Sequence, residues 1–189
     1  MRQHFHWAKD RFLYLLQQTR YIILGVMDGT LTALGAVSAG LFASLTPWET
    51  FKLTLGAGIG ITAASFTGAY LAEQAEQSKQ RAAAEKAMGV KRGYLAKTLF
   101  KLNQERKVLF RALADSSAAF AGTLVTAVPL VVLPAPLSFY TSLAFAFALL
   151  FGVGAYLGRL NKTSLLKSGL RVLAVCVAVF LISLLFGRA

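Results

Sequence analysis

One acidic residue lies deep in an apolar stretch of the sequence, where a carboxylate is costly to keep ionised. Asp28 is the only charged residue in the segment 21–45, and it lies about seven residues, or roughly 10 Å of helix, from the start of that segment. A carboxylate at such a depth is a candidate for carrying a cation or a proton. The structural alternative is a protonated Asp28 that only forms a hydrogen bond within a helix bundle.

Four residues near Asp28 in sequence, or in the next apolar stretch, offer polar or soft atoms. Met27 precedes Asp28, Thr32 follows it by one helical turn, and Thr62 and Ser65 belong to the next stretch. Side chains of this kind can line a polar path through a membrane, so these four are candidate pore-lining residues. Each hydroxyl can equally serve as an ordinary hydrogen-bonding group between helices.

A second acidic group follows the second apolar stretch. Glu73 and Glu76 are three residues apart, as are Glu85 and Met88, and Glu105 comes later. Residues three apart share one face of a helix, and carboxylates with an occasional thioether suit a divalent transition-metal ion. These five residues are therefore candidate metal ligands. The alternative is surface ion pairing, because a basic residue precedes both Glu85 and Glu105 by four positions.

The candidate residues must be positioned by membrane-spanning helices, which can be predicted from long segments with few charged residues. A spanning helix needs roughly 20 apolar residues, and the qualifying segments are 21–45, 53–72, 116–158 and 168–186. The third is too long for one helix and contains Pro134 and Pro136, which disfavour helix continuation. We therefore predict an all-α integral membrane protein with five transmembrane helices and a tight turn at 133–136.

The remaining segments predict two further helical elements. Residues 1–20 place apolar side chains at helical spacing among basic ones, which is typical of an interfacial helix. Residues 73–114 are rich in helix formers and are divided by Gly89 and Gly93, so we expect a cytoplasmic helical hairpin between the second and third spans. Residues 21–72 then hold the first two spans and residues 115–187 the last three. The returning helix of the hairpin is expected to carry an apolar stripe of Leu95, Leu99, Leu102 and Leu109.

Two local patterns predict how helices begin and pack. Thr46, Pro47 and Glu49 have the spacing of a capping box with proline at the first helical position. Small residues recur at every fourth position in the first two spans, which lets helices approach closely within one chain or between two chains. The residues of these stripes are Gly25, Gly29 and Ala33, then Gly56, Gly60, Ala64 and Gly68. A five-helix unit this small would gain from a partner, and we expect a homodimer.

The composition fits a membrane protein and excludes several other classes. Of the 189 residues, 56% are hydrophobic and 15% are charged, and the formal net charge is +12. Apart from Lys52 and Arg188, all Lys and Arg residues fall before the first span, within 73–114 or around the last connection. The positive-inside rule then places the N-terminus in the cytoplasm and the C-terminus outside. The basic balance thus reflects topology and not nucleic-acid binding, and the single Cys176 excludes a disulfide framework.

Several motifs are similar to those of the vacuolar iron transporter family. The resembling stretches are 25–29, which contains Met27-Asp28-Gly29, followed by 33–36 with Gly40, then 64–73, and Val128-Pro129-Leu130 with Leu133-Pro134. The similarity covers most of the chain from about residue 20 onward. The chain resembles a divergent, short, prokaryotic-type member, because the family commonly carries Met where Phe66 stands and Glu where Ala69 stands.

The resemblance implies a five-span homodimer in a prokaryotic cell membrane. Such a dimer would export a divalent cation, ferrous iron or possibly manganese, from the cytosol in exchange for protons. Asp28 would be the ion and proton carboxylate in the pore. The cytoplasmic metal-collecting groups would be Glu73, Glu76, Glu85, Met88 and Glu105. The cation is cargo in this interpretation, and no cofactor is implied.

The alternative hypothesis is a non-transporting membrane protein whose basic cytoplasmic helices bind anionic lipid or a protein partner. It predicts that Asp28→Asn is silent, whereas neutralising Lys91, Arg92 and Lys97 abolishes function. An enzyme is not expected, because the sequence has no Ser/His/Asp constellation and no glycine-rich phosphate loop before a helix.

Overall fold

The described part of the chain is entirely helical. The computed structural model describes residues 2–91, 93–95 and 99–187, with side chains described for 19–91, 93–95 and 104–185. Its helices are α1 (Arg2–Phe42), α2 (Pro47–Ala87), α3 (Leu99–Ala127), α4 (Pro129–Val132), α5 (Leu137–Leu160) and α6 (Leu165–Gly187). Five of them are long and apolar enough to cross a membrane. The predicted all-α class and the number of candidate spans are thereby confirmed.

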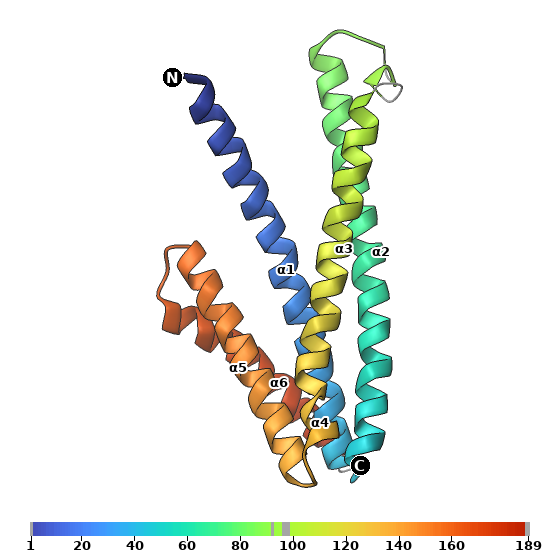
Figure 1. Ribbon diagram of the computed structural model, residues 1–189, viewed down its shortest axis with the longest axis vertical. Helices are drawn as coiled ribbons and strands as arrows, with labels where there is room; N and C mark the ends of the chain where they lie inside the picture. The colour runs from blue at the N-terminus through green and yellow to red at the C-terminus, as the bar shows by residue number, and fades with distance from the viewer. Residues whose placement is uncertain (1, 92, 96–98, 188–189) are drawn as a thin grey trace.

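The helices form two groups that meet along α1 (Figure 1). In one group α3 packs against both α1 and α2, and in the other α5 pairs with α6. The α5–α6 pair contacts the C-terminal half of α1, whereas the N-terminal half of α1 leans away from both groups. In Figure 1 the N-terminus and the α2–α3 connection lie toward the top of the molecule, the α5–α6 connection lies at about half its height, and α4 and the C-terminus lie at the bottom.

Both α1 and α2 are longer than the spans predicted for them. α1 runs without a break from the predicted interfacial segment into the first span, and each of the two helices has 41 residues. α2 continues past residue 72 because the Ala-, Glu-, Gln- and Lys-rich sequence that follows favours helix and contains no glycine before Gly89. The predicted boundaries at residues 20 and 72 therefore fall inside continuous helices.

The predicted helix start and stop signals of α2 are confirmed. Glu49 N donates to Thr46 Oγ1 at 3.3 Å, and Thr46 N donates to Glu49 Oε2 at 2.9 Å, which completes the capping box. After Ala87 the chain turns through Gly89 and Gly93, whose φ angles are +67° and +90°. Glycine is favoured in this left-handed region because it has no Cβ.

Two predicted details of α3 and its flanks need correction. Leu95 precedes the helix and Leu109 is exposed, so these two residues do not share a buried stripe on α3. The side chains of Leu99 and Leu102 lie outside the described residues. The buried face of α3 includes Val108, Ala112 and Asp115. α3 also ends at Ala127, and the short helix α4 precedes the turn at 133–136. Proline at position 129 fits the first turn of α4, where a missing N–H costs nothing.

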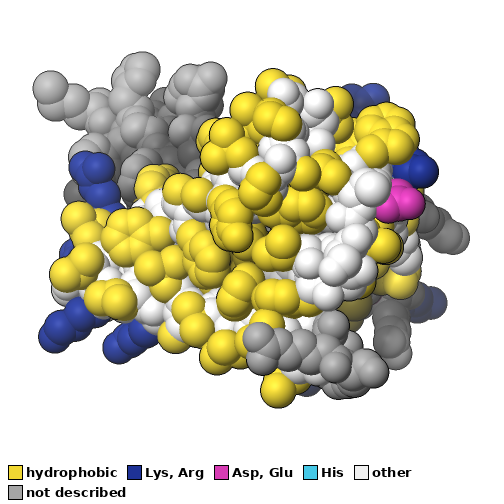
Figure 2. Space-filling model, turned by 90° about the horizontal axis from the view of Figure 1, so that it is seen from below, with side chains coloured by type: hydrophobic (Ala, Val, Ile, Leu, Met, Phe, Trp, Pro, Cys, Tyr) yellow, Lys and Arg dark blue, Asp and Glu magenta, His cyan; other side chains and the backbone are white. Residues whose placement is uncertain are grey.

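The apolar core lies where α1 meets α4, α5 and α6. Leu34 and Val37 of α1 pack there with Leu130, Phe139 and Cys176, among others. Cys176 is therefore a packing residue. Large apolar side chains are also exposed along α6 and α2, and hydrophobic side chains cover most of the end seen in Figure 2, with Lys and Arg at its margins. Exposed apolar surface of this extent marks contact with lipid or with another protein.

Candidate functional site

Glycines bring the backbones of α1 and α3 into direct contact. A Cβ added at Gly25 would lie 2.1 Å from the carbonyl oxygen of Asp115, and one added at Gly29 would lie 1.8 Å from that of Ala119. Thr123 Oγ1 donates to Gly29 O at 3.1 Å across the same contact. The small-residue stripe of the first span therefore packs within the chain. This contact, the α1–α3 seam, places Asp28 and Asp115 on facing helices.

Asp28 is the exposed member of this pair. It lies within the apolar part of α1, and its side chain is exposed. The Thr32 hydroxyl donates to the backbone oxygen of Asp28 at 2.8 Å and not to its carboxylate. Among the side chains that the structure describes, no Lys or Arg pairs with Asp28.

Asp115 is a second carboxylate that the sequence analysis did not single out. It is only 7% exposed, and its Oδ1 atom is buried without a hydrogen-bond partner in the described structure. The backbone of Asp115 meets Gly25, which lies three residues before Asp28 on the facing helix. The predicted boundary at residue 115 had put this residue at the edge of a span. In the sequence, Asp115 continues the helical period of Val108, Ala112 and Ala119, which was the available signal that it lies on an apolar face.

Glu73 joins three helices in a buried polar junction. Tyr21 of α1 donates its hydroxyl to Glu73 Oε2 at 2.6 Å, and Arg111 of α3 forms an ion pair with Glu73 Oε1. Gln77 Nε2 also reaches Glu73 Oε1, at 3.4 Å, and the Arg111 guanidinium lies 6.0 Å from the centre of the Tyr21 ring. The charge of Glu73 is thus compensated within the chain.

The other predicted cytoplasmic ligands lie in different surroundings. Glu76 is exposed and accepts a hydrogen bond from Gln80 at 3.1 Å. Glu85 is buried, whereas Met88 and Glu105 are exposed. Within the described ranges, no three His, Cys, Asp or Glu side chains lie close enough together to hold a metal ion. Collection of a cation by this group stays a prediction.

Glu85 holds the connection that follows α2. Its Oε2 accepts from Gly93 N and its Oε1 from Leu95 N, both at 2.9 Å. We expect Glu85→Ala to leave both amides without their acceptor and to loosen this turn by about 1–3 kcal/mol. Hydrogen exchange followed by mass spectrometry should show faster exchange at 93–95 in this variant and little change in Lys86→Ala, which alters an exposed neighbour. Unchanged exchange in Glu85→Ala would contradict this role.

Three of the four candidate pore-lining residues make contacts with the apolar core or with the backbone of their own helix. Met27 packs against the apolar core. Thr32 and Thr62 donate to backbone oxygens of their own helices, at 2.8 and 2.7 Å, and Ser65 is half-buried. Because Tyr21 meets Glu73 and Gly40 meets Thr50, the antiparallel register of α1 and α2 puts Asp28 at about the level of Ser65.

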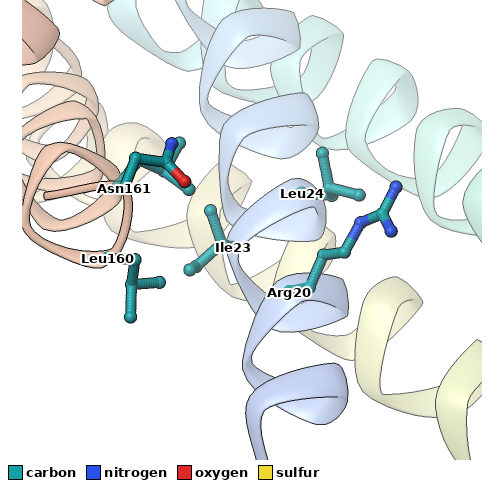
Figure 3. Close-up of a pocket in the computed structure, with 6 residues that line it drawn as sticks. Arg20, Ile23, Leu24, Leu160 and Asn161 are labelled. Carbon is teal, nitrogen blue, oxygen red and sulfur yellow. The ribbon is translucent and has the colours of Figure 1, made fainter. Parts of the chain in front are cut away.

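A separate apolar pocket of about 310 Å³ lies between α1 and the end of α5. Figure 3 shows Ile23 of α1 directed toward Leu160 and Asn161, with the Arg20 guanidinium extending away from them. None of the predicted ligands lines this pocket. Its apolar lining suits a hydrocarbon chain better than a cation.

Comparison with known proteins shows one similar chain but does not assign an activity. No protein-family model matches the chain. An uncharacterised protein of the archaeon Methanocaldococcus jannaschii is 29% identical over 171 residues, which cover 90% of this chain and 89% of the relative. The two chains are thus similar over nearly their full lengths.

Proposed function

We propose that this chain is a multi-pass membrane protein that exports a divalent cation, ferrous iron or manganese, in exchange for protons. The observation that carries the proposal is Asp28, an exposed carboxylate in an apolar span with no basic partner among the described side chains. Such a group in a membrane must bind a proton or a cation to avoid a large desolvation cost. The resemblance to vacuolar iron transporters supports the same assignment.

The membrane location is supported by the surface of the helices. α2 and α6 expose most of their apolar residues, which would be unfavourable in water over so large an area. The basic residues fall mainly in the first half of α1, from the second half of α2 to the first half of α3, and around the α5–α6 connection. In the proposed topology this end faces the cytosol.

In the proposed mechanism the exposed carboxylates near the cytoplasmic end raise the local cation concentration, and Asp28 exchanges that cation for a proton. Glu76 and Glu105 are exposed for such a role. Glu73 would have to release Arg111 before it could bind a cation, because the two residues are paired. Glu85 would similarly have to release the amides of Gly93 and Leu95.

The outer face of α2 supports the homodimer included in this proposal. Gly56, Gly60 and Gly68 have no described atom within 4 Å of an added Cβ. A second copy could therefore approach this face closely, as helix pairs in membranes do. Cross-linking of single cysteines introduced along this face would test the assignment.

Flux under an imposed pH gradient tests the proposed activity. A cation and a proton compete for one carboxylate, so acidifying the side toward which the cation is exported should speed its release. We expect manganous and ferrous ions to enter proteoliposomes faster when the lumen is more acidic than the medium. Flux that is indifferent to the pH gradient would contradict proton coupling.

Exposed basic side chains favour one second candidate function, the binding of anionic lipid. Of the three basic residues predicted for this role, Lys91 is exposed, whereas Arg92 and Lys97 lie outside the described residues. The neighbouring basic residues on α2 and α3 are also exposed, namely Lys79, Lys86, Arg106 and Lys107. Clusters of Lys and Arg beside a membrane attract anionic headgroups. Analysis of lipids that copurify with the protein should show loss of anionic lipid when these residues are changed to Gln, and unchanged lipid would exclude this role.

A further inference from the structure

We infer that Asp28 and Asp115 together form one acid site across the α1–α3 seam, which exchanges a divalent cation for two protons. This inference rests on the proposed function for Asp28 and adds the second carboxylate and the proton count. Asp115 is more than nine-tenths buried and keeps an unpartnered oxygen.

The glycine contacts explain why these two carboxylates are neighbours. Gly25 meets the backbone of Asp115, and Gly29 meets that of Ala119, so the two helices are in backbone contact on both sides of this level. Asp28 lies three residues after Gly25 and therefore on the same side of α1. Because no side chain separates the two backbones, carboxylates that flank the contact are held close together.

Charge balance around the pair requires a ligand. By position along the helices that pack here, the nearest ionisable residues are Tyr21 on α1, Tyr70 and Glu73 on α2, and Arg111 on α3. Arg111 comes one turn before Asp115 but pairs with Glu73, and that pair is neutral as a unit. Two carboxylates then remain without a basic partner among the described side chains. Two negative charges, one exposed within an apolar span and one buried, are neutralised either by two protons or by one divalent cation.

The two neutral states define a balanced exchange. Loading one divalent cation releases one proton from each carboxyl group, and unloading returns both protons, so no net charge moves with the site. Oxygen ligands of this kind accept manganous or ferrous ions, with water completing the coordination. The inference thus predicts one cation against two protons, and transport that is insensitive to membrane voltage.

Equilibrium binding of Mn²⁺ to the purified full-length protein tests this site without requiring transport. Free Mn²⁺ can be measured by electron paramagnetic resonance at several pH values. We expect Mn²⁺ affinity to rise with pH at a slope approaching two protons per ion in the wild type. Asp115→Asn should reduce that slope to one proton per ion or less and should weaken Mn²⁺ binding by more than about tenfold. A loss of about tenfold is expected even when a residue that only supports a metal ligand is removed.

Matched variants separate the loss of a carboxylate from a loss of folding. Asp115→Ser removes the charge with a smaller side chain and should share the phenotype of Asp115→Asn. Glu49→Gln, which retains a capping-box acceptor far from the seam, should bind as the wild type does. Wild-type affinity and slope in folded Asp115→Asn, or Mn²⁺ binding that neither aspartate affects, would overturn the inference. Binding through both aspartates without any flux would uphold this site and refute the proposed transport.

Discussion

Replacing Arg111 with Met is expected to destabilise the protein by about 3–5 kcal/mol, because removal of one partner of a buried ion pair leaves the other charge uncompensated. Glu73 would keep the Tyr21 hydroxyl but lose its counter-charge, with both ion-pair side chains largely buried. For a chain of this size the loss corresponds to a fall in the melting temperature on the order of 10 °C. Thermal unfolding of the detergent-solubilised protein at a fixed scan rate would measure it.

Two further variants show whether the effect comes from the unpaired charge. Combining Arg111→Met with Glu73→Leu removes both charges and should recover much of the lost stability, since a buried pair can be replaced by apolar residues at little cost. Glu76→Gln changes an exposed carboxylate on the same helix and should shift the melting temperature little. A melting temperature for Arg111→Met close to that of the wild type would show that the junction is not a structural element.

The second large effect is expected at Gly29, where no side chain fits. Gly29→Ala places a Cβ against the backbone carbonyl of Ala119, which cannot move without separating α1 from α3. We expect a cost at or above the upper end of the usual 1–3 kcal/mol for overpacking. The hydrogen bond from Thr123 to Gly29 would also be strained. Gly29→Val should leave little folded protein, as judged by size-exclusion chromatography.

Gly152 in α5 provides the matched control for this prediction. An added Cβ there meets no described atom within 4 Å, so Gly152→Ala should be neutral or slightly stabilising through helix propensity. Wild-type yield and stability in both glycine variants would show that the close approach at Gly29 does not hold in solution.

Much of the fold could be predicted because its signals are local. Charge-poor windows gave five apolar helices, and the spacing of Thr46, Pro47 and Glu49 predicted the start of α2. The boundaries at residues 20 and 72 could not be predicted, since a change from apolar to polar composition does not interrupt a helix made of good helix formers. The buried face of α3 was not predicted, because it includes the small residue Ala112 and the carboxylate Asp115, which give a weak apolar period.

The site was predicted less completely because it depends on contacts between helices. The sequence singled out Asp28 by its apolar surroundings, but it could not show that Asp115 faces the same seam. It also treated Glu73 as a free ligand, whereas the structure pairs it with Arg111, which lies 38 residues further along the chain. Partners so distant in sequence are set by packing, and spacing within one helix does not reveal them.

The most direct test of the proposed function compares manganous-ion flux into proteoliposomes for the wild type, Asp28→Asn and Glu49→Gln under the same pH gradient. Each protein should first be shown to be folded and inserted. We predict proton-dependent flux in the wild type and in Glu49→Gln, and loss of that flux in Asp28→Asn. Equal flux in all three, or no flux of manganous or ferrous ions in the wild type, would contradict a role for Asp28 in proton-coupled cation export.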